Sequence, residues 1–329
     1  MIWTIVLISF LFLLPFIVKT YYLSVVNLMC LNILVALGLN VLVGNTGQIS
    51  LGHAGFVAIG AYSSALLLNL GLPFLPALLS AGIIAGFIGA LIGVPSFKLE
   101  GPYLAIATLA FGMAVTIIIG RLDVFGGRMG MSVPRIQLGW TGLKYDISLY
   151  YIFIGITVIM VIITRNIVKS RIGRAFQAIR DSDIAASVAG VHLAKYKTMS
   201  FAISAFYAGL AGCLWALYLQ FVTPGSFSFM MSVLFLATVV LGGLGSVTGS
   251  VMGAILMSWL SLQLEKIVEV PVLGHMIMKF TGLFMNPSGI ANITWVITGL
   301  ILIMVILFEP LGLFGLWLRI KRYWKMWPF

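Results

Sequence analysis

Side chains that could carry out covalent chemistry or hold a metal ion are few in this sequence and do not cluster. Neither of its two cysteines, Cys30 and Cys213, has the spacing of a metal ligand, and both lie in apolar runs. His53 opens another apolar run, where a packed, hydrogen-bonded histidine is more common than a ligand. Because HExxH, GxSxG and GxxxxGK(S/T) motifs are all absent, we expect no catalytic residue, no metal site, no cofactor and no ATP hydrolysis in the chain itself.

Glycines carry a clearer signal, because several of them interrupt apolar runs. Gly44 and Gly47 form one such break, and a second break lies at 242–246. Where a membrane helix breaks, freed backbone groups can line a path for a polar solute. The residues that we expect at a translocation path are therefore Gly44, Gly47, Ser50, Gly52, His53, Gly101, Tyr103, Gly242, Gly243, Gly245 and Ser246.

A weak internal similarity links the two breaks. GNTGQIS at 44–50 and GGLGSVT at 242–248 share glycine at their first and fourth positions and a hydroxyl residue at the seventh. Chance explains this equally well, since glycine breaks are common in membrane helices. By contrast, Gly82, Gly86 and Gly89 share one helix face, a pattern typical of tight helix packing.

The longest charged segment, residues 165–197, has a helical pattern between Gly173 and Gly190. Its apolar face consists of Ala175, Phe176, Ile179, Ala186 and Ala189. A short amphipathic helix in such a loop either lies on anionic lipid or docks into a groove of a soluble partner. Its small apolar residues would gain little from insertion into lipid, which favours docking.

The composition predicts the fold class. Of the 329 residues, 61% are hydrophobic and only 8% are charged, whereas soluble domains have about 25% charged residues. Soluble enzymes and disordered chains are therefore excluded. A membrane helix needs about 20 apolar residues, so we predict an all-α, polytopic transmembrane helical bundle that forms a single domain over residues 1–329. The net charge of +11 reflects basic residues beside the spans, and it indicates orientation rather than nucleic-acid binding.

The apolar runs suggest about ten spans. They lie near 1–18, 21–43, 50–70, 74–97, 102–120, 150–164, 198–220, 230–242, 247–264 and 291–308, and the first is read as a retained span. The basic loop 165–197 and the basic tail should be cytoplasmic. This orientation places both termini inside and the loops 121–149 and 263–290 outside. Eight or nine spans remain possible, because the run at 102–120 is short enough to be broken or re-entrant.

Several stretches resemble the inner-membrane permease subunits of branched-chain amino acid ABC importers, in particular the LivM type. The matching stretches are GNTGQISLGHAGFVAIGAYSSALL at 44–67, GPYLAIATLAFG at 101–112, GGRMGMSVP at 126–134, RIGRAFQAIRDSDIAASVAGV at 171–191, TVVLGGLGSVTGSVMGA at 238–254 and EPLGLFGLW at 309–317. They run through nearly the whole chain in the family's order.

The resemblance implies a bacterial inner-membrane permease that pairs with a second, LivH-like permease. It also implies two ABC ATPase subunits, which bind ATP and Mg²⁺, and a periplasmic substrate-binding protein. The helix in the charged loop would be the coupling helix that contacts an ATPase. The coupling residues implied are Gly173, Arg174, Arg180, Asp181, Asp183, Ala185, Ala186 and Gly190. Related importers have an acidic residue before the two alanines, whereas this chain has Ile184 there and Asp183 one position earlier.

Three other functions are compatible with the composition. A related ABC permease could carry urea or short amides. A stand-alone channel or ion-coupled carrier is less favoured, because no Asp, Glu, Lys or Arg lies deep in any expected span and such carriers usually need one. A membrane scaffold without transport activity is the third alternative.

Overall fold

The computed structural model describes residues 14–15, 18–99, 101–136, 145–269, 299–300, 303–304, 307, 309 and 312–325. Its long helices are α2 (Thr20–Leu39), α3 (His53–Asn69), α4 (Phe74–Gly93), α5 (Pro102–Arg121), α6 (Tyr145–Lys169), α9 (Leu193–Leu219), α10 (Phe229–Gly242), α11 (Val247–Glu269) and α14 (Gly312–Lys325). The described chain is thus almost entirely helical, which confirms the predicted class. Most of the span at 1–18, the loop at 263–290 and the span at 291–308 lies outside the described residues.

Short elements connect these helices. They are the π-helix η1 (Asn40–Asn45), the 3-10 turns η2 (Pro95–Phe97), η3 (Asp123–Phe125), η4 (Gly127–Met129) and η5 (Pro224–Ser226), the helices α7 (Arg171–Asp181) and α8 (Asp183–Val188), and the strands β1 (Met131–Ser132) and β2 (Phe221–Val222). The two strands pair antiparallel, with Met131 opposite Val222. This pairing joins the segment before α6 to the segment before α10.

By length and composition, six segments of the described chain could cross a membrane. They are Thr20–Asn45, Phe74–Gly93, Pro102–Arg121, Tyr145–Lys169, Leu193–Leu219 and Pro224–Gly242. The expected loop boundaries need correction, because helices continue into polar flanking sequence. The described connection before α6 ends at Tyr145 rather than at 149, and the charged connection covers 170–192 rather than 165–197.

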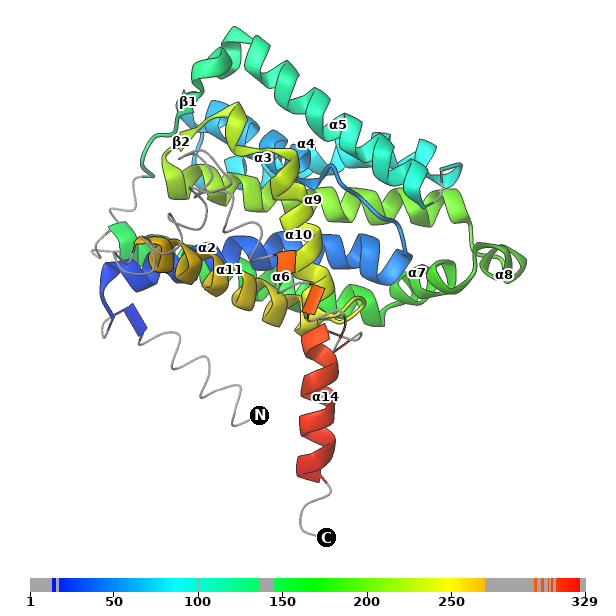
Figure 1. Cartoon of the computed structure of the whole chain (residues 1–329). Coiled ribbons are helices and arrows are strands. Elements are labelled where there is room, and N and C mark those ends of the chain that lie inside the picture. The colour runs from blue at the N-terminus through cyan, green and yellow to red at the C-terminus, as the bar shows by residue number, and fades with distance from the viewer. Residues whose placement is uncertain are drawn as a thin grey trace, which may run out of the picture.

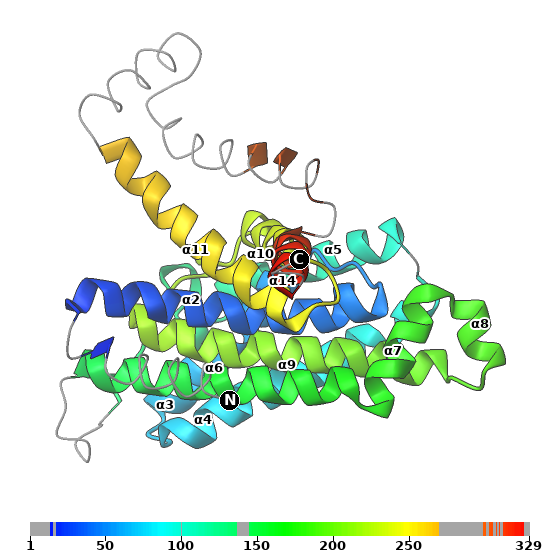
Figure 2. The same ribbon diagram turned by 90° about the horizontal axis from the view of Figure 1, so that it is seen from below.

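The long helices α2, α6 and α9 run side by side, with α7 and α8 at one end of them (Figures 1 and 2). In contrast, α10 and α14 cross this direction in Figure 1 and are seen nearly end-on in Figure 2. The expected span at 230–242 therefore corresponds to a transverse helix. Helix α10 connects β2 to α11.

Glycines allow the central helices to approach closely. A Cβ atom on Gly60 of α3 would clash with the backbone of Gly209 in α9. On α4, Gly82 faces Phe206 and Gly89 faces Ala205, so the predicted packing role of the α4 glycines is confirmed. Small residues at such contacts let helix backbones pack without intervening side chains, which strengthens van der Waals attraction in a membrane.

Helix α3 begins in the interior of the bundle. Beyond η1 the chain continues as coil, and α3 starts only at His53. A Cβ atom on Gly52 would clash with the carbonyl of Thr108, which lies inside α5 rather than at either end. The amide of Ala54 donates a hydrogen bond of 2.9 Å to the Ser232 hydroxyl in the first turn of α10. The expected span at 50–70 is consequently a shorter helix that starts where α5 and α10 meet it.

Candidate functional site

The first predicted break is a π-helical end to α2. Residues 40–45 form η1, in which each backbone hydrogen bond spans one residue more than in an α-helix. Side chains support the wider turn, because Asn45 Nδ2 donates to the Asn40 carbonyl at 3.3 Å and Thr46 Oγ1 donates to the Val41 carbonyl at 3.0 Å. Gly47 then takes a φ of +75°, which ends the helical course of the chain. This buried polar segment is a candidate for part of a solute path.

The second predicted break lies directly against the first. Between α10 and α11 the backbone turns through Gly243, at φ +112°, and Gly245, at φ +84°. The amide of Gly245 donates a hydrogen bond of 2.8 Å to Asn40 Oδ1. A Cβ atom on Gly44 would clash with this Asn40 side chain and with the Gly245 amide. The end of α2 and the α10–α11 turn therefore form one junction, although Asn40 and Gly245 are 205 residues apart in sequence.

Arg180 of α7 completes this junction. Its Nη1 atom donates a hydrogen bond to the carbonyl oxygen of Gly44. A Cβ atom on Gly245 would lie only 2.8 Å from the same Nη1. The atoms nearest to a Cβ atom on Gly47 would also belong to Arg180, from its backbone and its side chain. One residue expected in the coupling segment thus contacts three glycines expected at the path.

The coupling segment consists of two helices rather than the single helix expected between Gly173 and Gly190. Ser182 separates them, because its extended backbone ends α7 and its hydroxyl accepts a hydrogen bond from the amide of Ala185 in α8. Gly190, at φ +84°, ends α8, and the Val191 amide bonds the Ala186 carbonyl in a Schellman arrangement. The glycine stop was thus expected correctly, whereas the serine cap was missed.

An ion pair attaches α8 to the start of α9. The carboxylate of Asp183 pairs with Nζ of Lys197, whose side chain is only 6% exposed. This contact accounts for the acidic residue that lies one position away from the family pattern. It leaves the apolar side chains of Ile184 and Val188 facing outward, at 78% and 84% exposed.

The remaining coupling residues divide between the core and the surface. Ala186 is buried, and a Cβ atom on Gly173 would clash with the end of α6. Arg174, Asp181 and Ala185 are exposed, and the Arg174 side chain hydrogen-bonds only the Lys169 carbonyl among the described residues. Gly173 therefore fixes the corner between α6 and α7, while the exposed residues are available to a partner.

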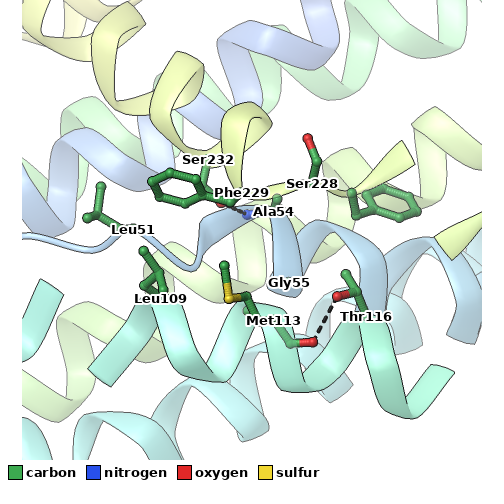
Figure 3. A pocket seen from close by; sticks show the side chains of 11 residues that line it. Leu51, Ala54, Gly55, Leu109, Met113, Thr116, Ser228, Phe229 and Ser232 are labelled. Atoms are coloured by element: carbon green, nitrogen blue, oxygen red, sulfur yellow. Dashed lines mark hydrogen bonds between the residues drawn. The ribbon is translucent and has the colours of Figure 1, made fainter. Parts of the chain in front are cut away.

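A small polar cavity lies where α3, α5 and α10 meet (Figure 3). It measures about 50 Å³, and its wall includes Ala54, Met113, Ser228 and Ser232. The hydroxyl of Ser228 caps α10 by accepting a hydrogen bond from the Met231 amide at 3.4 Å. The first turns of α3 and α10 therefore both face this cavity, and helix N-termini favour negatively charged groups. Neither serine is among the residues expected at the path, although Ser228 directly precedes an apolar run, as an N-cap does.

Several residues expected at the path have another role in the structure. His53 is fully buried, with Nε2 3.3 Å from the Ser204 hydroxyl and its ring against Phe56, so it packs in the core. Tyr103 is 73% exposed on α5. Gly242 packs against Gly249 of α11.

Four others lie near the breaks but do not join the junction. The Ser246 hydroxyl caps α11 through the Gly249 amide. Gly101 has a φ of +54° and opens α5. The Ser50 hydroxyl is buried and has no hydrogen-bond partner in the described part of the chain, and Gly52 packs on α5. These residues shape the helix starts around the breaks.

Among the described residues, no three His, Cys, Asp or Glu side chains are placed to hold a metal ion. Besides the Arg180 guanidinium, the polar groups described at the junction and around the cavity are amides, hydroxyls and backbone carbonyls. Such groups can exchange hydrogen bonds with a passing solute.

Residues 21–306 of this chain match the family of branched-chain amino acid transport system permease components. The matched range includes α7, both helix breaks and the cavity between α3, α5 and α10. The chain belongs to this family. The permease is 38% identical over 226 residues to the high-affinity branched-chain amino acid transport system permease protein LivM of Escherichia coli strain K12. This match covers 61% of the chain and 53% of the relative, so the chain spans about half the length of that curated relative. The family is one of transport subunits, which agrees with the expectation that the chain is not an enzyme.

Two archaeal proteins extend the comparison. The permease is 24% identical over 239 residues to the probable LivM protein of Methanocaldococcus jannaschii, covering 72% of the chain and 67% of that protein. It is also 26% identical over 278 residues to the probable LivH protein of the same organism, covering 80% of the chain and 82% of that protein. No solved structure matches the permease.

Proposed function

We propose that the chain is the transmembrane permease subunit of an ATP-driven ABC importer for branched-chain and other hydrophobic amino acids. Its partners would be a second, LivH-like permease, two ABC ATPase subunits and a periplasmic binding protein. The family match and the LivM relatives support the cargo and the type of complex. The similarity to a LivH protein supports a partner permease of the same fold.

The proposed topology places the α7–α8 end in the cytoplasm of a bacterium, with the bundle in the inner membrane. Basic residues gather at that end, including Arg165, Lys169, Arg171, Arg174 and Lys195, and the cytoplasmic side is enriched in Lys and Arg. On this orientation both termini are cytoplasmic. The proposed count of ten spans includes α3 and the transverse α10. Both helices are shorter than the about 20 residues of a typical membrane-spanning helix.

The exposed apolar pair on α8 supports the proposed ATPase contact. Ile184 and Val188 are one helical turn apart, and both side chains face away from the bundle. Two such residues at the end of a basic, polar loop are typical anchors for a groove on a soluble protein. The Asp183–Lys197 pair holds them in place on α9.

The hydrogen bond between Arg180 and Gly44 is the observation that carries the proposed mechanism. It connects α7 to the end of α2, and Asn40 connects that end to the α10–α11 turn. When ATP draws the two ATPases together, movement of α8 and α7 would pull on both breaks at once. Rigid-body rocking of this kind alternates access without an ionisable residue in the spans.

The proposed path passes the cavity between α3, α5 and α10. Hydroxyls and the positive N-terminal ends of α3 and α10 there would lower the barrier for a zwitterion without binding it tightly. Tight binding is unnecessary, because the periplasmic protein would select the cargo and ATP on the partner subunits would supply the free energy.

Affinity capture from native membranes, followed by mass spectrometry, tests the proposed complex. We expect a second permease and ABC ATPases to co-purify, and the binding protein of the same complex to bind leucine, isoleucine or valine. A captured binding protein that prefers urea or a short amide would overturn the proposed cargo. Capture of the chain alone, under conditions that preserve another ABC importer in the same membranes, would overturn the proposed complex.

A further inference from the structure

A second cavity lies at the end of the bundle opposite α7 and α8. It measures about 340 Å³ and lies between the first two turns of α2 and of α6, the end of α9 and Arg135. This volume is at the lower end of the range of about 300–1,000 Å³ found for small-molecule sites. In the proposed orientation the cavity is at the periplasmic surface, and it shares no described lining residue with the cavity between α3, α5 and α10.

One wall carries a positively charged group that is held in place. Arg135 Nε donates a hydrogen bond of 3.3 Å to Gln220 Oε1, and the guanidinium lies 5.5 Å from the centre of the Tyr145 ring. Gln220 ends α9 at a φ of +58°, the one positive φ of a non-glycine residue in the described chain. Arg135 makes no ion pair with any described residue. Its terminal nitrogens are thus free to bind a carboxylate, for which the planar guanidinium is well suited.

The same cavity carries a negatively charged group. Asp146 lies in the first turn of α6, and its side chain also lines the cavity. It forms no ion pair with Arg135 or with any other described residue. Opposite charges that share a small cavity without pairing leave room for a ligand that carries both charges.

Two buried polar atoms in the cavity wall lack partners. Asn27 is only 4% exposed, and its Oδ1 atom accepts no hydrogen bond from any described residue. The hydroxyl of Tyr145 is likewise buried without a partner. Buried polar atoms are nearly always hydrogen-bonded, so an unpartnered acceptor beside a charged cavity points to a missing donor. Leu23 and Leu149 complete the lining with apolar surface.

We infer that this cavity is an outer binding site for one free α-amino acid in its zwitterionic form. The carboxylate binds the Arg135 guanidinium, the ammonium group binds Asp146 and donates to Asn27 Oδ1, and an aliphatic side chain packs on Leu23 and Leu149. The inference rests on the proposed function, because it gives an imported amino acid a place to bind after the periplasmic protein releases it.

Ligand analogues test each charge separately. The probes are radiolabelled L-leucine, 4-methylpentanoate, which lacks the ammonium group, and 3-methylbutylamine, which lacks the carboxylate. Binding is measured on the assembled complex in lipid nanodiscs, without ATP and without the binding protein. We expect L-leucine to bind at least about tenfold more tightly than either analogue, because each analogue loses one charge-assisted contact.

Variants assign these contacts to residues. Arg135→Gln should weaken leucine binding about tenfold but leave 3-methylbutylamine binding unchanged. Asp146→Asn should remove the preference for leucine over 4-methylpentanoate. Arg128→Gln is the matched control, since Arg128 is an exposed arginine of the same outer segment that does not line the cavity.

Each contrary outcome is distinct. Absence of leucine binding, or equal binding of the three probes, would overturn the outer site. An equal loss of all probes in Asp146→Asn would show a structural role and would also overturn it. If ATP-driven leucine uptake persists at the normal rate in Arg135→Gln and Asp146→Asn, the outer site fails while the proposed function stands. If the complex imports no amino acid, the proposed function fails whatever the binding results.

Discussion

The guanidinium of Arg180 hydrogen-bonds the backbone carbonyl of Gly44, which lies 136 residues earlier in the chain. This contact places a cationic side chain of α7 at the C-terminal end of a helix, where carbonyls lack intrahelical donors and the helix dipole is negative. Asn40 binds the same segment to Gly245 at 2.8 Å. Helix α7 and both helix breaks are thus one mechanically connected unit.

Arg180→Gln should uncouple transport from ATP hydrolysis. A hydrogen bond from a charged group contributes about 1.5–3 kcal/mol, so we expect roughly a tenfold or larger fall in the ratio of solute imported to ATP hydrolysed. The ratio is measured on the complex in proteoliposomes. Arg174→Gln is the control, because the Arg174 side chain is exposed and hydrogen-bonds only the Lys169 carbonyl among the described residues. Equal effects of the two substitutions would contradict the role of Arg180.

Breaking the pair between Asp183 and Lys197 should loosen α8. Asp183→Asn leaves a Lys197 side chain that is 6% exposed without its counter-ion, and such a buried charge destabilises a protein by about 3–5 kcal/mol. Because the Asp183 side chain is 26% exposed, we expect a smaller local loss of about 2–3 kcal/mol. Limited proteolysis between residues 181 and 192 measures the opening of this segment.

The double variant Asp183→Asn with Lys197→Met provides the control for that experiment. It removes both charges, so α8 should be protected better than in Asp183→Asn alone. If the single and double variants are cleaved at the same rate, the ion pair does not hold α8.

Replacing Gly60 should prevent the central helices from packing. In Gly60→Val the new side chain would clash with the Gly209 backbone, and overpacking of this kind typically costs about 1–3 kcal/mol or more. Gly155→Ala is the matched control, because no described residue lies within 4 Å of a Cβ atom at Gly155 in the middle of α6. We expect Gly155→Ala to stabilise the helix by about 0.5–1 kcal/mol. Thermal unfolding in detergent compares the two variants, and a folded Gly60→Val protein of normal stability would argue against this contact.

Substitutions on the exposed face of α8 should release the ATPase without unfolding the bundle. Ile184→Asp and Val188→Asp change side chains that are 78% and 84% exposed. We expect the amount of co-purifying ATPase to fall at least about tenfold, with unchanged thermal stability of the permease. Ala189→Asp is the comparison, since Ala189 is also exposed but lies beyond the end of α8. Retention of the ATPase by both α8 variants would place the contact elsewhere.

Sequence patterns predicted the helical class and most helix positions, because long apolar runs have few other stable conformations in a membrane. They also located both glycine breaks and the helix stop at Gly190. The contact between the breaks could not be predicted, because it depends on how α2 packs on the α10–α11 turn. A signal did exist in Asn40, a polar residue inside an apolar run, and intramembrane polar residues are usually functional or paired.

Other differences have local causes. His53 was expected at the path, but a helix that starts inside the bundle buries its first residue, so the ring packs on Phe56. Tyr103 lies on the outer surface of α5. The sequence alone does not show which face of α5 packs on α3, so it does not determine this orientation. The single helix expected at 173–190 is divided at Ser182, because a serine with an extended backbone both ends one helix and caps the next. The amphipathic pattern continues across that break and therefore concealed it.

ATP-driven uptake of radiolabelled leucine into proteoliposomes is the most direct measurement. Four preparations are compared: the permease pair alone, the pair with its ATPases and binding protein, the same complex without ATP, and the complex carrying Arg180→Gln. We expect accumulation against a gradient only in the complete complex with ATP, and a strong loss with Arg180→Gln while ATPase binding persists. Leucine accumulation by the permease pair alone, driven by an ion gradient, would contradict both the importer function and the coupling through α7.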